Sequence, residues 1–179
     1  APGNAGTATE NKCENVALNI LDNAAIIAFA KEKAVDLVLV GPEAPLVNGV
    51  VDACRAADVK VWGPTQFAAQ LEGSKAFAKH FLKRHNIPTA FYDVFTEVDA
   101  AKAFVEKNGA PIVIKADGLA AGKGVIVAMT NQEAFDAIDD MLAGNKFGDA
   151  GSRVVIEEFL AGEEASFICM IDGDNILPM

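Results

Sequence analysis

Hydrophobic and polar positions alternate between two patterns over the first 73 residues. Apolar runs of strand type occupy residues 16–20, 36–43 and 59–65, and amphipathic stretches of helix type occupy residues 22–33, 45–57 and 66–73. Continuous apolar strands separated by amphipathic helices are typical of βαβ units, in which a parallel sheet is buried on both faces. The pattern therefore predicts an α/β fold whose N-terminal domain, residues 1–73, is a Rossmann-like parallel-sheet domain with its first strand missing.

The pattern changes near residue 73, which indicates a domain boundary. A helix is expected over residues 74–86 with Ser74 as its N-cap, and a second helix ends at Gly109. The remaining expected elements are an extended segment at 87–95, strands at 111–115, 124–129 and 153–160, a helix at 131–144, and a hairpin at 164–179 with its turn at 172–175. This second part is predicted to be mixed and largely antiparallel.

Composition excludes several classes of protein. Half of the 179 residues are hydrophobic, which indicates a buried globular core, yet no apolar run approaches the length of a membrane span. A net charge of -10 disfavours binding to nucleic acid. The three cysteines lack the spacing of a zinc site or a disulfide framework, so a reducing, cytoplasmic location is expected.

The stretch KADGLAAGKGV, residues 115–125, is rich in glycine and lysine but is not a P-loop. It is one residue short, lacks the Ser or Thr, and lies between two strands. Lys115 ends an apolar strand, where an ammonium group must reach solvent or meet an anion. Glycines at 118, 122 and 124 around Lys123 allow backbone to approach a bound group closely. A phosphate ligand explains this pattern; a surface hairpin is the alternative.

The segment VVIEEFLAGEEASF, residues 154–167, is a second candidate site. The backbone from Glu157 to Leu160 could offer hydrogen bonds to a purine, and Glu164 could accept hydrogen bonds from ribose hydroxyls. An acidic surface turn is the alternative. No motif for nucleophilic catalysis is present, so catalytic residues stay unknown.

The order of these pieces resembles a known fold. A helix with GSKAFAK, then PIVIKADGLAAGKGVIVA, then VVIEEFLAGEEASF, resembles the ATP-grasp superfamily. The stretches APGNAGTA, VGPEAPLVNGVVDA, WGPT and QLEGSKAF are similar to one family within it, the phosphoribosylamine-glycine ligases, also called glycinamide ribonucleotide synthetases. The resemblance covers essentially the whole chain. It implies that residues 74–92 start the ATP-grasp core, 93–159 form its small α+β lid subdomain, and 160–179 return into an incomplete core.

The resemblance also implies an activity. The family uses ATP to join glycine to 5-phosphoribosylamine through a glycyl phosphate, in purine biosynthesis, with Mg²⁺ or Mn²⁺ as cofactor. The implied ATP-binding residues are Lys75, Lys115, Gly118, Gly122, Lys123, Gly124, Glu157, Glu158, Phe159, Leu160 and Glu164. The implied residues on the phosphoribosylamine side are Gly3, Asn4, Gly6, Gly41, Pro42 and Glu43. No metal ligand is expected in this chain, and the full-length protein is expected to be a monomer with small-molecule partners only, neither nucleic acid nor membrane.

Two expectations concern the limits of the resemblance. Part of the family's sequence is missing before Ala1 and after Met179, so we expect a fragment that cannot turn over alone. Other ATP-grasp enzymes, such as biotin-carboxylase-like or aminoimidazole-ribonucleotide carboxylating proteins, and a non-catalytic nucleotide-binding module, remain as alternatives.

Overall fold

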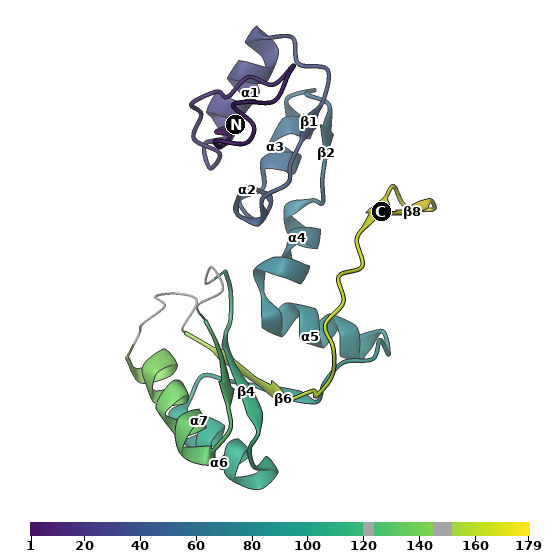
Figure 1. The fold of residues 1–179 in the computed structure, drawn as a ribbon. Coiled ribbons are helices and arrows are strands. Elements are labelled where there is room, and N and C mark those ends of the chain that lie inside the picture. The colour runs from purple at the N-terminus through teal and green to yellow at the C-terminus, as the bar shows by residue number, and fades with distance from the viewer. Residues whose placement is uncertain (120–123, 145–151) are drawn as a thin grey trace.

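The computed structural model describes residues 1–119, 124–144 and 152–179. Figure 1 shows an N-terminal part at the top, two linking helices in the middle, and a sheet covered by helices at the bottom. The chain then passes from the sheet back along the linking helices and ends in a small hairpin that stands apart from the sheet. This arrangement confirms the predicted α/β fold with separate parallel and antiparallel sheets.

The N-terminal part contains a two-stranded parallel sheet and its helices. Val38 in β1 pairs with Val61 in β2, and the next residues pair in the same register. The core beside this sheet is formed by buried aliphatic residues on the helices, centred on Val50, Val51 and Cys54. The elements are α1 Asn23–Glu32, β1 Val38–Leu39, α2 Glu43–Val47, α3 Val50–Ala56, β2 Val61–Trp62 and α4 Gln66–Gly73.

Two expectations for this part are wrong. Residues 16–20 form no strand, because no described segment provides the ladder of hydrogen bonds that a strand needs. The helix expected over residues 45–57 is two helices, α2 and α3. Gly49 separates them with φ 80°, a left-handed conformation that glycine adopts without steric cost and that ends a helix.

Helix α5 (Lys75–Arg84) follows α4 directly, and Ser74 is the residue between them. The Ser74 backbone N–H donates to Gln70 in the last turn of α4, while its side-chain oxygen accepts from Phe77 N–H in the first turn of α5. One extended residue thus terminates one helix and caps the next. The predicted N-cap at Ser74 is confirmed.

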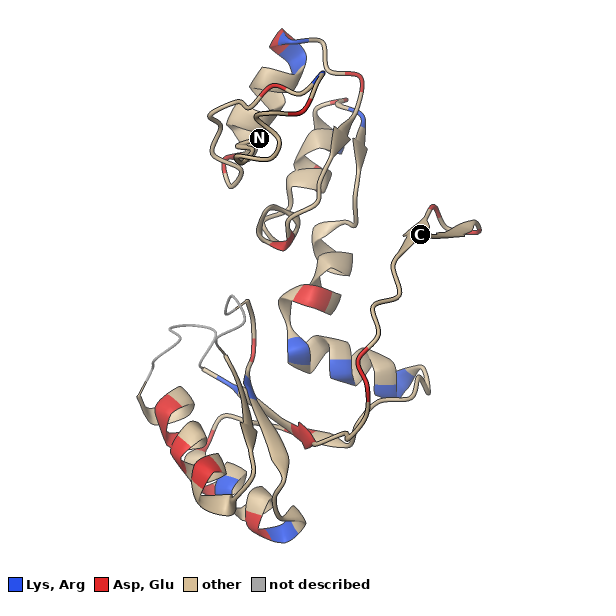
Figure 2. Ribbon diagram, in the orientation of Figure 1, with Lys and Arg blue, Asp and Glu red and all other residues tan. Residues whose placement is uncertain are grey.

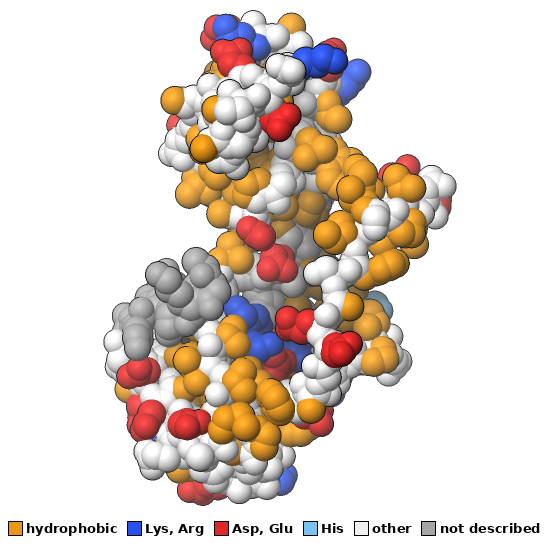
Figure 3. Space-filling model, viewed as in Figure 1, with side chains coloured by type: hydrophobic (Ala, Val, Ile, Leu, Met, Phe, Trp, Pro, Cys, Tyr) orange, Lys and Arg blue, Asp and Glu red, His pale blue; other side chains and the backbone are white. Residues whose placement is uncertain are grey.

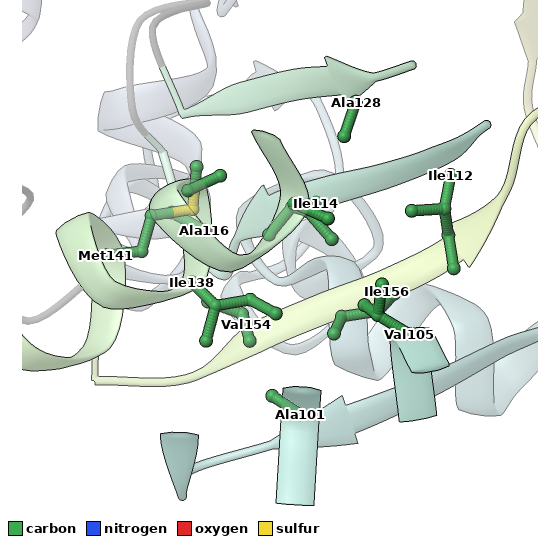
Figure 4. Packing of buried hydrophobic residues seen from close by; sticks show 12 residues of the cluster. Ala101, Val105, Ile112, Ile114, Ala116, Ala128, Ile138, Met141, Val154 and Ile156 are labelled. Carbon is green, nitrogen blue, oxygen red and sulfur yellow. The ribbon is translucent and has the colours of Figure 1, made fainter. Parts of the chain in front are cut away.

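The second part is built on a four-stranded antiparallel sheet in the order β3-β6-β4-β5. Its central strands, β4 and β6, are rich in β-branched residues and largely buried. Helices α6 and α7 pack against one face, and Figure 4 shows the aliphatic side chains that fill the space between them. The elements are β3 Tyr92–Phe95, α6 Val98–Asn108, β4 Ile112–Ala116, β5 Val125–Ala128, α7 Asn131–Ile138, the π-helical turn η1 Asp139–Ala143, and β6 Val154–Glu158.

Alternate residues of β4 and β6 point to the other face of the sheet, toward α5. Lys115 and Glu157 lie on this face because the side chains of a strand alternate between its two sides. The chain ends in β7 (Cys169–Ile171) and β8 (Ile176–Pro178), the expected hairpin. Within the described residues, no helix combines the length and apolar character that a membrane span requires.

Candidate functional site

A cavity of about 690 Å³ lies between α5 and the face of the sheet that α6 and α7 leave open. Figure 3 shows it as a hollow with basic side chains gathered inside, and Figure 2 places those bases along α5 and on the strands below it. The lining residues come from α2, α4, α5, β4, β5, β6 and the turn after β4: Glu43, Ala44, Leu71, Glu72, Lys75, Ala78, Lys79, Leu82, Lys115, Gly118, Leu119, Gly124, Val125, Val155 and Glu157.

Two lysines share one buried carboxylate in this cavity. Lys79 on α5 pairs with Oε2 of Glu157, and Lys115 on β4 pairs with Oε1 of the same group. The side chain of Glu157 is 5% exposed, whereas those of Lys79 and Lys115 are 13% and 28% exposed. Glu157 is therefore a buried charge whose two oxygens are both compensated, as burial requires.

Burial and mutual repulsion perturb the lysines. Burial lowers the pKa of Lys115, and the neighbouring Lys79 and Lys75 lower it further. Burial also lowers the pKa of Lys79, an effect that Glu158 partly offsets. Several positive charges thus converge on one wall of the cavity, and an anionic ligand on that wall would favour their charged forms.

Lys75 contacts the turn that follows β4. Its Nζ donates a hydrogen bond of 2.8 Å to the carbonyl oxygen of Gly118. Gly118 has φ 100°, which other residues rarely adopt, so glycine permits the sharp turn that brings this carbonyl to Lys75. The turn and the start of α5 are therefore joined directly.

Asp117 provides a second connection between β4 and α5. Its buried carboxylate accepts hydrogen bonds from Ala76 N–H at 3.1 Å and from the hydroxyl of Ser74, and it pairs with Arg153. The Asp117 carboxylate therefore places a negative charge of the protein itself at the positive, N-terminal end of the α5 dipole.

A metal ion finds no evident site in this part of the chain. Among residues 1–119, 124–144 and 152–179, no group of three or more His, Cys, Asp or Glu side chains is placed to hold one. Glu157, the buried acid of the cavity, already has both oxygens paired with lysines.

Two protein-family models together match the whole chain. Residues 73–179 match the model of the phosphoribosylglycinamide synthetase ATP-grasp (A) domain, and residues 1–72 match that of the N domain of the same synthetase. The chain belongs to the phosphoribosylglycinamide synthetase family. The resemblance inferred from the motifs is thereby confirmed.

Relatives within the family support this assignment, and a structure from outside it shares the fold. A phosphoribosylamine–glycine ligase from Vibrio cholerae is 71% identical over the whole chain, which spans 42% of that protein. The crystal structure of the Thermotoga maritima phosphoribosylamine–glycine ligase has a TM-score of 0.75 at 30% identity and covers 99% of this chain and 41% of its own. A biotin carboxylase complex with β,γ-ATP from Campylobacter jejuni has a TM-score of 0.66 at 25% identity, covering 79% of this chain and 32% of its own. The chain therefore spans well under half the length of these proteins.

The cavity brings together about half of the residues that the family resemblance implied for ATP. Lys75, Lys115, Gly118, Gly124 and Glu157 line it. Gly122 and Lys123 lie outside the described residues, so the structure does not place them. The cavity lining does not include Glu158, Phe159, Leu160 or Glu164, which follow Glu157 along the chain; Leu160 is 65% exposed.

The residues implied for the phosphoribosylamine side lie in two places. Glu43 lines the same cavity as the lysines, while Pro42 lines a separate apolar hollow of about 210 Å³ beside α1 and β1. Asn4 lies in a turn of its own: its side-chain oxygen accepts from Thr7 N–H, and its backbone N–H donates to the Thr7 hydroxyl. Gly3 and Gly6 belong to the same N-terminal segment, and Gly41 precedes Pro42; none of these three lines the described cavity.

Lys79 and Asp117 are the site residues that sequence reasoning missed. Lys79 follows Lys75 by one helical turn, so a search for lysines on the same face of α5 would have found it. Asp117 carried no comparable signal, because its partners Ser74 and Ala76 are distant in sequence.

Proposed function

We propose that the cavity binds ATP, with the triphosphate against the lysine-bearing wall. The observation that carries this proposal is the convergence of Lys75, Lys79 and Lys115 from a helix and a strand onto one hollow. Lysine side chains and glycine-rich turns are common means of neutralising and approaching phosphate groups. In this arrangement Lys75 and Lys115 contact the phosphates, and the turn with Gly118, Gly122, Lys123 and Gly124 lies over them.

The adenosine would lie beside the end of β6. The backbone from Glu157 through Glu158 and Phe159 to Leu160 would hydrogen bond to the adenine, and Glu164 would accept from the ribose. The exposed position of Leu160 is compatible with a backbone edge that remains open to a ligand. Residues Gly3, Asn4, Gly6, Gly41, Pro42 and Glu43 would form the phosphoribosylamine side, and Glu43 supports this because it reaches the cavity.

The whole protein that contains this chain is proposed to be an ATP-dependent ligase of purine biosynthesis. The name of its relatives, phosphoribosylamine–glycine ligase, supports the two substrates that it would join. The γ-phosphoryl group of ATP passes to the glycine carboxylate, which gives glycyl phosphate and ADP. The amine of 5-phosphoribosylamine then attacks the acyl carbon, and phosphate leaves as the amide forms. The lysines contribute by holding the triphosphate and by balancing the charge that moves with the phosphoryl group.

Several attributes accompany this function as part of the proposal. Mg²⁺, or Mn²⁺, would accompany ATP, but the described residues offer no site for it, so we assign it no step. The substrates are small molecules, and the net charge of -10 supports the absence of a nucleic-acid partner. A monomeric, cytoplasmic protein without a membrane partner completes the proposal. The domain limits 1–73, 74–92, 93–159 and 160–179 are proposed as well.

The test is the release of ADP by a full-length protein that contains this chain. We expect release to require both glycine and 5-phosphoribosylamine, and bicarbonate in place of glycine to give none. Lys115→Ala should lower kcat/KM for ATP by about 100-fold, since a fixed charge near the phosphates is lost. Lys107→Ala, on the exposed side of α6, is the matched control and should have no effect. ADP release that is independent of glycine would overturn the proposal.

The 179-residue chain should be assayed beside the full-length protein. The prediction that the short chain does not turn over stays a prediction until that measurement, and turnover by it would contradict the sequence-based expectation.

A further inference from the structure

We propose that Lys79 is a positioning residue that occupies one oxygen of Glu157 and thereby leaves the charge of Lys115 available to a nucleotide phosphate. The inference rests on the proposed function, because it assigns a role within the same cavity. Both lysines pair with the buried carboxylate of Glu157, but Lys79 has further partners and Lys115 is more exposed.

Lys79 is held by several partners at once. Besides its ion pair with Glu157, its Nζ donates a hydrogen bond of 2.8 Å to the hydroxyl of Thr89 and lies 5.7 Å from the ring centroid of Tyr92. Its side chain is also the less exposed of the two lysines. An ammonium group with these partners in a mostly buried position is fixed in place, and a ligand would have to displace all of them to use it.

Lys115 is held less firmly. Within the described residues its one ion-pair partner is Glu157, and its side chain is 28% exposed to the cavity side. It extends from a central strand of the sheet, so its backbone position is rigid. Of the two lysines, Lys115 is therefore the one that can turn toward a ligand in the cavity.

The three groups carry two positive charges and one negative charge. While Lys79 is present, Glu157 balances only one of the two ammonium groups, and one positive charge remains at the cavity wall. Without the Lys79 charge, Glu157 and Lys115 would form a neutral buried pair. A phosphate would then have to compete with a buried carboxylate for Lys115 at short range and in a weakly screening environment.

A change in the protonation of Lys115 does not explain the predicted loss. Lys79 is one of the groups that lower the pKa of Lys115, after burial itself. Removing the Lys79 charge therefore raises the pKa of Lys115, which keeps it protonated. The loss comes from pairing with Glu157 rather than from a missing proton.

The experiment measures the affinity of the full-length protein for ATP and for adenosine by calorimetry, and compares their ratio among variants. Lys79→Met should lower the ATP-to-adenosine affinity ratio by about 10-fold, because phosphate contacts depend on the spare charge and adenosine contacts do not. Lys79→Arg keeps the positive charge, so this variant should have the wild-type ratio. Lys83→Met is the matched control, since Lys83 also lies on α5 over the Tyr92 ring, at 5.9 Å, and makes no ion pair with Glu157.

A double substitution separates charge balance from a structural contribution. In Lys79→Met with Glu157→Gln, Lys115 again has an uncompensated charge, so the ratio should return toward the wild-type value. This variant also carries the test if Lys79→Met alone does not fold. An unchanged ratio in Lys79→Met, or no recovery in the double variant, overturns the inference while the proposed function stands. Failure of the wild-type protein to bind ATP overturns both.

Discussion

The ring of Tyr92 contributes to the stability of the fold, whereas its hydroxyl lowers that stability. The ring lies within 6 Å of the ammonium groups of Lys79 and Lys83 and is 5.8 Å from the ring of His80. Its hydroxyl oxygen is buried and has no hydrogen-bond partner in the part of the chain that the structure describes. A buried polar atom without a partner has lost its water without compensation.

Tyr92→Phe should therefore raise the free energy of unfolding, by about 1 kcal/mol, because the ring contacts stay and the unpaired hydroxyl is removed. Urea unfolding monitored by circular dichroism measures this change. A loss of about 1 kcal/mol or more would mean that the hydroxyl has a partner after all.

The free energies of unfolding of the wild type and of Tyr92→Phe should also differ in their dependence on pH. Burial, with a smaller contribution from Asp93, raises the pKa of Tyr92 above its ordinary value of 10.0. The folded state thus favours the neutral phenol, and this contribution is complete below the unfolded pKa and is lost as pH rises through the folded pKa. The stability of the wild type relative to Tyr92→Phe should fall at alkaline pH over that range.

At the residue scale, the sequence identified the unusual charges but not their partners. Lys115 stands out because it is the one charge in an otherwise apolar strand, whereas Glu157 belongs to a segment that is singled out for its backbone. Lys79 stands out only through its spacing of one helical turn from Lys75, and that spacing is the same whether the lysine meets solvent or a buried carboxylate. The difference arises only when β6 is brought against α5.

At the element scale, α5 depends on the strand that faces its first turn. Ten residues are too few for a stable isolated helix, so packing and capping must hold it. Ser74 provides a local cap, and the Asp117 carboxylate adds acceptors for Ala76 N–H and for the Ser74 hydroxyl. The start of α5 is therefore completed by the end of β4.

Asp117→Ala should lower the free energy of unfolding by about 2–4 kcal/mol, because it leaves a buried helix N–H without its acceptor and removes a charged hydrogen-bond partner. Asp93→Ala is the matched control: Asp93 is exposed, and its side chain accepts from the adjacent Val94 N–H. Asp93→Ala should alter the free energy of unfolding by no more than about 0.5 kcal/mol. Equal effects of the two substitutions would contradict the assigned role of Asp117.

Local signals located most elements, and hydrophobic periodicity missed two breaks within predicted helices. The helices with a side-chain N-cap at Thr65, Ser74 and Thr130 begin where the sequence places them. The helix predicted over 131–144 changes to a π-helical turn after Ile138, and the break at Gly49 divides another. The break at Gly49 follows from the left-handed conformation of that glycine, and hydrophobic periodicity alone marks neither difference.

At the scale of the whole molecule, the cavity lies between α5 and the sheet. Figure 1 shows how the linking helices and the sheet are arranged. Its walls come from elements on both sides of the change in pattern near residue 73, from Glu43 in α2 to Glu157 in β6. The sequence predicted the two folds on either side of this change. It could not predict their contact, because the ion pairs and hydrogen bonds between α5 and the sheet join residues far apart along the chain.

The Asp117 cap has a consequence for hydrogen exchange. The Ala76 amide proton, in the first turn of α5, is held by the Asp117 carboxylate at the end of β4, whereas the Ala68 amide proton, in the first turn of α4, is held by Thr65, the N-cap of its own helix. Opening of the sheet should therefore release the Ala76 proton and leave the Ala68 proton protected. Ile114→Val, a small truncation in the core of the sheet, should speed exchange at Ala76 by about fivefold and not at Ala68. Equal acceleration at both amides would show that the two parts open together. If exchange speeds up at Ala76 alone, the exchange rate of this one helix amide reports the opening of the sheet.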